Sequence, residues 1–287
     1  MDTKIDYSHR LLPTQRSQRP AVPAHVWDLS EYRGWREEIW TLIEDFADAR
    51  VRRAFLKNPP TYVVSDDLRW LDRIIAEARD IEIDSKAELA DRLRKRFRAL
   101  RCVHGTRTAE LESFYGDGLK PMVPEMIHDQ ARAIYLSGDF PELAEIDLQR
   151  AIAQVGTNVR GGRLYFECNE KMLRRYAGHY MLYGSEYLVA IARNLPGLQD
   201  YANVLKTRGT PTLFVCDVPL DLVDHSVLME FSGYALQCVF QELLEGEDFA
   251  PDPMLGAGFC IWKVLQPEHI VGHCHPEISY DPIAHWR

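Results

Sequence analysis

Three separated segments of the chain hold residues of the types that bind ligands or catalyse reactions. In the first, residues 100–107, a short apolar run ends in His104-Gly105-Thr106, and Gly118-Leu119 follows. The run predicts a β-strand, at whose end the glycine would let a ligand approach the backbone closely. A His-Gly-Thr sequence alone usually forms an ordinary turn. The segment therefore indicates a ligand site only in combination with the other two segments.

The second segment contains a pair of tyrosines. Residues 161–166 read Gly-Gly-Arg-Leu-Tyr-Phe and predict a strand that presents Tyr165, while Tyr176 follows on a predicted helix. The two rings could enclose a flat aromatic ligand, since an offset-stacked pair contributes about 0.5–1.5 kcal/mol beyond its buried area. The alternative is purely structural: Tyr176, Tyr180, Tyr183 and Tyr187 would form the inner face of one helix.

The third segment supplies a carboxylate. Residues 266–271 read Gln-Pro-Glu-His-Ile-Val and place Glu268 at the start of a predicted terminal strand. A carboxylate beside a developing positive charge stabilises a transition state more than the ground state. Glu186, in the stretch Tyr-Gly-Ser-Glu-Tyr-Leu-Val at 183–189, is a second candidate for the same role.

Together these segments resemble the His-Tyr-Glu signature of the diphtheria-toxin-like and poly(ADP-ribose) polymerase-like ADP-ribosyltransferases. The resemblance extends over roughly residues 100–276 of the 287, and residues 1–99 resemble no family. The matching stretches, in the family's order, are His104-Gly105-Thr106, Gly118-Leu119, Gly162-Arg163-Leu164-Tyr165-Phe166, Tyr176 and Glu268-His269-Ile270-Val271.

The resemblance implies that NAD⁺ is a substrate and that no metal is needed. Gly105 would then offer its backbone to the nicotinamide carboxamide, His104 would bind a ribose hydroxyl, and Thr106 would line the same corner. Tyr165 and Tyr176 would stack on the nicotinamide ring. The catalytic residues would be His104, Tyr165 and Glu268, whose carboxylate would bind the nicotinamide ribose and stabilise the cation.

The choice between the two glutamates rests on chain order. Glu186 matches the family's glutamate strand better in its letters, but it follows Tyr176 by only ten residues. The family places several strands between the second tyrosine and the glutamate, which favours Glu268. Glu186 is expected on a helix, where it could face the molecule that accepts the ADP-ribose group.

The implied activity is the transfer of a single ADP-ribose to a macromolecule, either a protein or a nucleic acid. By analogy alone, such an enzyme would suit a bacterial toxin, effector or phage-defence protein with an antitoxin or chaperone partner. Three alternatives use the same fold: an NAD⁺ glycohydrolase, a catalytically inactive binding module, and a tRNA 2′-phosphotransferase-like enzyme. The last needs arginines and a second histidine that cannot be placed.

The helices and strands predicted around these residues, together with the resemblance, indicate an α+β fold. We expect a split, mixed or antiparallel sheet and a helical N-terminal region. We expect a flexible arm over 1–27, helices within 28–99, and a catalytic domain over 100–287. Apolar spacing predicts helices around 35–46, 65–78, from Ser85 to about 100, and 226–244. Alternation and flanking turns predict strands around 212–218, 259–265 and 269–274.

A basic run over 92–101 has two interpretations. It could guide a nucleic acid toward His104, or it could be the solvated face of an amphipathic helix, which its regular apolar stripe favours. The net charge, 34 basic against 43 acidic residues or −9, argues against general coating of nucleic acid or membrane.

The remaining composition predicts a cytoplasmic protein without a membrane contact. The chain has no long apolar span and no hydrophobic N-terminal leader, and its six dispersed cysteines predict reduced, mostly buried thiols. His269, His273, His275 and Cys274 could suggest zinc, but no second cluster with a finger or ribbon spacing accompanies them. We therefore predict no metal site.

Overall fold

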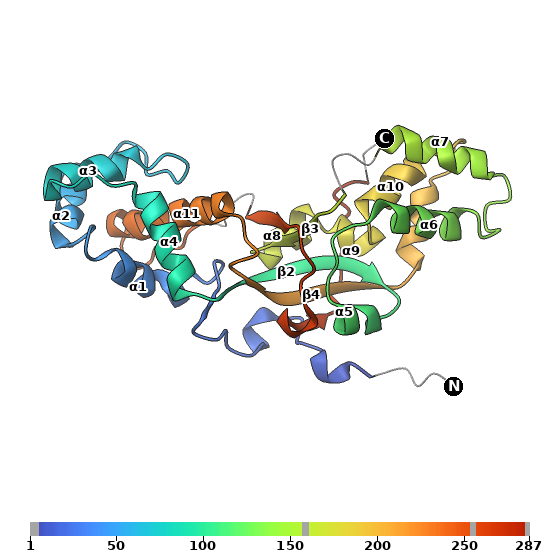
Figure 1. The fold of residues 1–287 in the computed structure, drawn as a ribbon, viewed down its shortest axis with the longest axis horizontal. Coiled ribbons are helices and arrows are strands. Elements are labelled where there is room, and N and C mark those ends of the chain that lie inside the picture. Colours follow the sequence, from blue (N-terminus) through green and yellow to red (C-terminus); the bar gives the residue numbers. More distant parts are fainter. Residues whose placement is uncertain (1–5, 157–160, 253–256, 285–287) are drawn as a thin grey trace. The chain divides into compact units, whose positions relative to one another are not determined.

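The computed structural model describes residues 6–156, 161–252 and 257–284, and it confirms the α+β class with a helical N-terminal region (Figure 1). The chain forms two compact units. The first comprises Met1–Pro20, Cys102–Cys216 and Cys260–Arg287, and the second comprises Ala21–Arg101 and Asp217–Phe259. The units therefore differ from the three contiguous ranges expected from the sequence, because each is assembled from segments far apart in the chain.

The strands join in one mostly antiparallel, six-stranded sheet of order β5-β3-β2-β4-β6, and β1 pairs with β2 in parallel. Antiparallel pairing sets Val103 opposite Glu167 and Phe214 opposite His273. The strands predicted around 212–218 and 269–274 are confirmed with small shifts of their ends, whereas the one predicted around 259–265 ends at Ile261. Their bounds are β1 Val26–Trp27, β2 Ala99–Thr108, β3 Leu164–Glu167, β4 Thr210–Pro219, β5 Gly258–Ile261 and β6 Ile270–Cys274.

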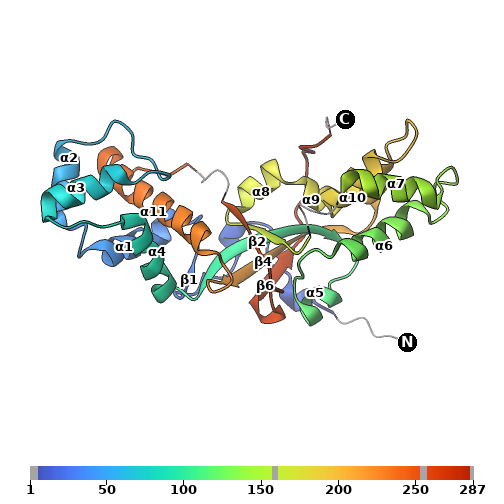
Figure 2. The same cartoon turned by 45° about the horizontal axis from the view of Figure 1, so that its top comes forward.

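The second unit contains the predicted N-terminal helices together with α11, and α4 lies alongside α11 in both views (Figures 1 and 2). Carboxylates define two of the helix starts: Asp48 accepts backbone hydrogen bonds at the start of α2, and Asp84 does so for α4. The Trp27 ring packs against Phe97 and Phe231 in the core. The helices are α1 Tyr32–Ile43, α2 Ala49–Lys57, α3 Arg69–Arg79, α4 Ser85–Arg96 and α11 His225–Glu245.

Three of the six basic residues in the run are neutralised inside the second unit. Arg92 pairs with Asp45 and Glu88, Arg96 pairs with Glu38, and Arg101 pairs with Asp217. Lys95 and Arg98 are exposed. The contacts therefore favour the structural interpretation of the run, in which its arginines hold helices and strand ends together.

The first unit surrounds the sheet with short helices. One core cluster, centred on Tyr135 and Tyr187, joins α6, α7, α10 and η3, and another packs Leu173 and Met181 against Val103 of the sheet. The elements are α5 Glu112–Asp117, α6 Pro124–Tyr135, α7 Glu145–Val155, α8 Glu170–Tyr176, α9 His179–Tyr183, α10 Glu186–Arg193, η3 Tyr201–Thr207 and η4 Pro267–His269. Five of the six cysteines are buried, as predicted.

From Asp6 onward the N-terminal segment is packed, which differs from the expected flexible arm. Arg10 donates to the backbone carbonyl of Ile270 at 2.9 Å. Arg19 pairs with Glu170 at 2.6 Å, and both side chains are less than one-tenth exposed (7% and 8%). A buried ion pair of this kind fixes the position of the segment, because removing either partner would leave the other charge buried without compensation. Within the described residues, no helix has the length and apolar character needed to span a membrane.

Candidate functional site

His104 lies in β2 and connects two of the three predicted segments. Its Nδ1 is 2.8 Å from the backbone carbonyl of Tyr165 in β3. Because a carbonyl oxygen can only accept, Nδ1 carries the proton, and Nε2 of the neutral ring is left as an acceptor. Burial lowers the pKa of His104 and outweighs the opposing effect of this hydrogen bond. The ring is therefore neutral near pH 7 and suited to accept a hydrogen bond from a hydroxyl group.

Strand alternation sorts the candidate side chains between the two faces of the sheet. Val103 pairs with Glu167, so Gly105 and Tyr165 belong to one face, whereas His104 and Phe166 belong to the other. The His104 and Phe166 rings are indeed neighbours, with centroids 5.9 Å apart. His104 thus reaches β3 through the Tyr165 backbone and not through the Tyr165 ring.

The side-chain face of Gly105 is already filled. A β-carbon at this position would stand 3.0 Å from Leu173 Cδ2 and 3.2 Å from Met181 Cγ. A nicotinamide group would therefore have to meet Gly105 through its backbone, which is the contact that the sequence resemblance implies. Thr106, one residue further along β2, donates its hydroxyl to the backbone carbonyl of Gly184 at 3.5 Å.

The two predicted stacking tyrosines are both accessible. Tyr165 is 45% exposed in β3, and Tyr176 is 55% exposed at the end of α8. Within the described residues, neither ring stacks against another aromatic ring, and the guanidinium of Arg175 lies 5.3 Å from the Tyr176 ring centre. The structure therefore does not bring the two rings together, but it leaves both available to a ligand.

The structural alternative for the tyrosines, one long helix with an inner tyrosine face, is wrong. Tyr176 ends α8, Tyr180 and Tyr183 belong to α9, and Tyr187 belongs to α10. The chain turns at Gly184, whose φ is +82°, and Ser185 then caps α10 by accepting from the backbone of Leu188. The Gly-Ser pair was the sequence signal for this break.

Glu268 lies apart from the His-Gly-Thr strand. It belongs to η4, which packs against α5 and precedes β6, and β4 lies between β6 and β2 in the sheet. Its carboxylate is exposed, and it makes no hydrogen bond or ion pair within the described part of the chain. No contact in the structure links Glu268 with His104, Tyr165 or Tyr176.

Glu186, in contrast, follows a turn that contacts β2 directly. A β-carbon on Gly184 would stand 3.2 Å from the carbonyl oxygen of Arg107, so the turn is seated against the end of the strand. Glu186 is the first residue of α10, so it lies on a helix as predicted. Tyr180 donates its hydroxyl to Glu186 Oε2 at 3.0 Å, which orients the half-buried carboxylate.

Of the terminal histidines that the structure describes, only His273 is buried, and it pairs with Tyr115, whereas His275 is exposed. His273 Nδ1 lies 2.7 Å from the Tyr115 hydroxyl oxygen, and the His273 and His275 rings are 5.1 Å apart. Burial, with a smaller contribution from His275, lowers the pKa of His273 to about 4. Within the described residues, no three histidine, cysteine or carboxylate side chains gather closely enough to hold a metal ion.

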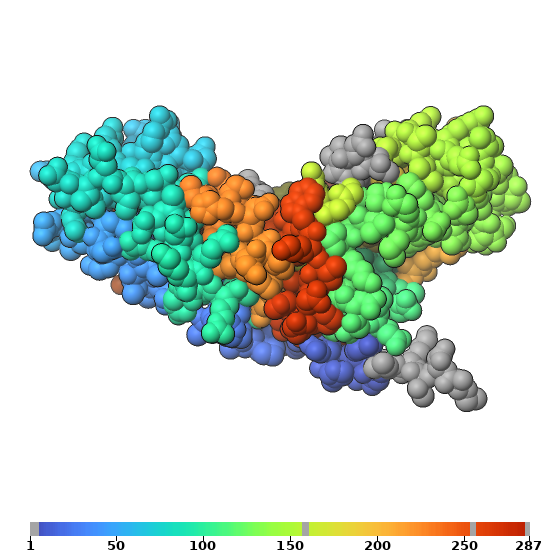
Figure 3. Space-filling model, viewed as in Figure 1, coloured from blue at the N-terminus to red at the C-terminus, as the bar shows by residue number. Residues whose placement is uncertain are grey.

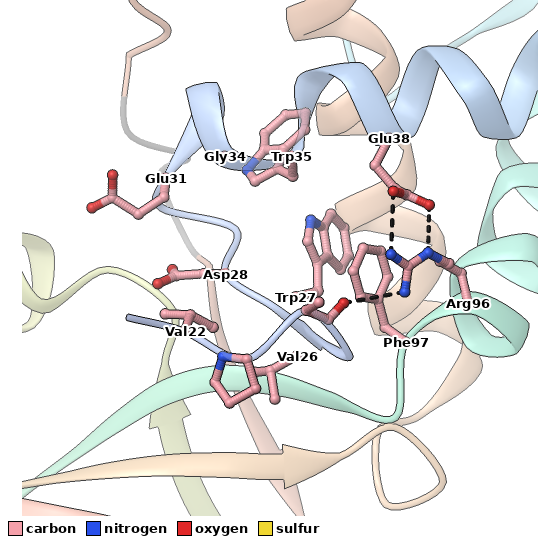
Figure 4. A pocket seen from close by; sticks show the side chains of 12 residues that line it. Val22, Val26, Trp27, Asp28, Glu31, Gly34, Trp35, Glu38, Arg96 and Phe97 are labelled. Atoms are coloured by element: carbon pink, nitrogen blue, oxygen red, sulfur yellow. Dashed lines mark hydrogen bonds and ion pairs between the residues drawn. The ribbon is translucent and has the colours of Figure 1, made fainter. Parts of the chain in front are cut away.

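A pocket of about 490 Å³ lies in the second unit, and none of the predicted site residues lines it (Figure 4). Trp27, Trp35 and Phe97 form its aromatic wall. Arg96 crosses its edge, where it pairs with Glu38 and donates to the carbonyl of Ala24 at 3.1 Å. Because the one arginine is already occupied by a carboxylate, this pocket offers little to an anionic dinucleotide.

Comparisons with protein families, with curated proteins and with solved structures found no significant match to this chain.

Proposed function

We propose that the chain is an NAD⁺-dependent mono-ADP-ribosyltransferase that modifies a macromolecule. One observation carries the proposal: the hydrogen bond from His104 Nδ1 to the Tyr165 carbonyl, which joins the His-Gly-Thr strand to the Leu-Tyr-Phe strand. These two segments are far apart in the sequence, yet they lie in neighbouring strands, β2 and β3. The pairing sets a neutral imidazole acceptor beside the backbone of the Leu-Tyr-Phe strand, whereas the accessible Tyr165 ring belongs to the opposite face of the sheet.

The reaction exchanges one bond to the ribose for another. The bond between ribose C1′ and the nicotinamide nitrogen breaks, and its electron pair leaves with nicotinamide. A lone pair of the acceptor then bonds to C1′, and the acceptor loses a proton. His104 Nε2 would accept from a ribose hydroxyl, and Tyr165 and Tyr176 would stack on the ring. A carboxylate would stabilise the positive charge that develops on the ribose.

We assign that carboxylate to Glu186. Its turn contacts Thr106 and Arg107, which directly follow His104-Gly105 on β2. Glu268 precedes β6, and its turn packs against α5. A charge must act at short range to stabilise a transition state, so we favour the glutamate whose preceding turn contacts β2.

The proposal is tested by incubating the full chain with NAD⁺ labelled on its adenylate half, with and without cell extract. Label that enters a macromolecule, and is then released by protease or by nuclease, supports the proposal and identifies the acceptor class. Nicotinamide release without incorporated label would instead establish an NAD⁺ glycohydrolase. Binding of NAD⁺ without nicotinamide release would establish a binding module and overturn the proposed activity.

The pH dependence tests the role of His104. Protonation of Nε2 removes its acceptor, and burial places the pKa of His104 below the ordinary value of 6.5. We therefore expect kcat/KM for nicotinamide release to stay level from about pH 8 to pH 6.5 and to fall only in more acidic solution. In His104→Gln the amide oxygen does not titrate. This variant should have a lower kcat/KM for nicotinamide release, and it should lose the part of the fall at acidic pH that is due to His104. A decline that begins above pH 6.5, or that is identical in the variant, would contradict this role.

A further inference from the structure

Two exposed rings, Trp262 and Tyr165, and the partly buried Arg163 form a strip of aromatic and cationic side chains near the start of β3. The Arg163 guanidinium lies 4.9 Å from the Trp262 ring centre, and its Nη1 donates to the Tyr165 hydroxyl at 3.4 Å. Trp262 is 53% exposed and Tyr165 is 45% exposed. In Figure 3 the red segment that follows β5 meets the yellow-green segment that precedes β3 on the surface. A β-carbon on Gly162 would contact the Trp262 ring at 3.9 Å, which confirms that these two segments touch.

The positive charge of the strip is not neutralised within the described residues. Arg163 forms no ion pair there, whereas Arg92, Arg96 and Arg101 of the second unit each pair with a carboxylate. Lys263, next to Trp262, is exposed as well. The strip therefore presents cationic groups and accessible rings together, although the chain as a whole carries a net charge of −9.

A second pair of the same kind lies on α8, which packs against β3. The Arg175 guanidinium is 5.3 Å from the Tyr176 ring centre, and Tyr176 is more than half exposed. Like Arg163, Arg175 forms no ion pair within the described residues. Two arginine–aromatic pairs thus accompany β3, one before the strand and one after it.

We propose that Trp262, Arg163 and Arg175 of this strip bind a single strand of nucleic acid and present it for ADP-ribose transfer, next to the Tyr165 and Tyr176 rings that would hold the nicotinamide. Exposed rings stack on unpaired bases, and arginines contact the phosphates between them. Unneutralised arginines would repel a basic polypeptide, so charge complementarity favours a polyanion. The proposal rests on the proposed transferase activity, because it names the acceptor class for that site.

The test measures binding to the full chain without NAD⁺, so a failure here is distinct from a failure of the transfer reaction. Fluorescence anisotropy follows end-labelled single strands of about 12 nucleotides, as DNA and as RNA, in low salt. Trp262→Ala should weaken binding about tenfold, and Trp262→Phe should retain most of it because phenylalanine still stacks. Arg163→Gln should weaken binding severalfold and reduce the slope of log affinity against log salt by about one.

Two control variants separate the strip from the rest of the surface. Tyr62→Ala removes another exposed ring, 76% accessible in the second unit, and should leave binding unchanged. Arg98→Gln removes an exposed cation of the basic run and should have less effect than Arg163→Gln. The proposal is overturned if the wild-type chain binds no single strand, if Trp262→Ala binds within twofold of the wild type, or if Arg98→Gln is the more damaging change. Equal binding of an acidic polypeptide such as polyglutamate would also overturn it.

Discussion

Glu186→Gln is expected to lower the rate of nicotinamide release from NAD⁺ by about 100- to 1000-fold, the usual loss when one charge-stabilising group is removed from an active site. The substitution keeps the size of the side chain but removes the negative charge that would stabilise the cationic ribose. The Glu186 turn is seated against β2 beside Thr106 and Arg107, so the loss should act at the site of bond breaking. Nicotinamide is measured directly, by chromatography or by release of label.

Two further variants show whether the charge or the local structure is responsible. Tyr180→Phe removes the hydrogen bond to Glu186 Oε2 but leaves the carboxylate, and we expect a loss of less than about tenfold. Glu268→Gln changes an exposed carboxylate in η4 and should act within about threefold of the wild type. The opposite pattern, a large loss for Glu268→Gln with Glu186→Gln fully active, would transfer the catalytic role to Glu268.

Gly118→Ala is expected to destabilise the protein by more than about 4 kcal/mol, because it combines two unfavourable effects. Gly118 ends α5 with φ +85° and ψ −178°, a backbone conformation that essentially only glycine adopts. A β-carbon there would stand 2.2 Å from the carbonyl oxygen of Leu265. That carbonyl cannot move away easily, since Leu119 and Leu265 exchange two backbone hydrogen bonds of 2.9 Å each.

The matched control is Gly138→Ala. Gly138 also has a positive φ, +101°, but nothing lies within 4 Å of the position of its β-carbon. We expect only the conformational cost there, about 1–2 kcal/mol. Free energies of unfolding from urea titrations measure the difference, and similar values for the two variants would show that the contact with Leu265 is not a steric obstacle.

Local sequence patterns predicted several of the elements, but not α2, α6 or α7, and not how the elements are grouped. The helices α1, α3, α4 and α11 follow the spacing of apolar residues, and β4 is enclosed by a glycine and a proline. The N-terminal segment shows what such patterns miss. Its prolines and polar residues indicate an arm, whereas its packing depends on the ion pair of Arg19 with Glu170, 151 residues away. Nothing in the sequence pairs those two side chains.

The candidate site was predictable to a similar degree. The motifs correctly placed His104 and Tyr165 in strands, because both lie in short apolar runs next to glycines, but only the structure shows that these strands are neighbours. The placing of the glutamates required the three-dimensional structure. Glu268 was expected at the start of a strand but lies in η4 just before β6, and the sequence does not show that β4 separates β6 from β2. The contact of Gly184 with Arg107 was equally hidden, since it joins a helix-capping turn to a distant strand.

Because the first unit is built from separate segments of the chain, it can be completed only after its last segment has been synthesised. The second unit is complete once Phe259 has been made, but the first unit still lacks its last segment, which contains β6. Until then Leu213, Phe214 and Val215 of β4 have no partner strand on that edge, although all three are buried in the finished protein. An apolar strand with an unpaired edge is a template for aggregation. A ribosome that stalls, or a stop codon that falls, after Phe259 but before β6 has been made would therefore release a chain prone to aggregate rather than a shorter working protein.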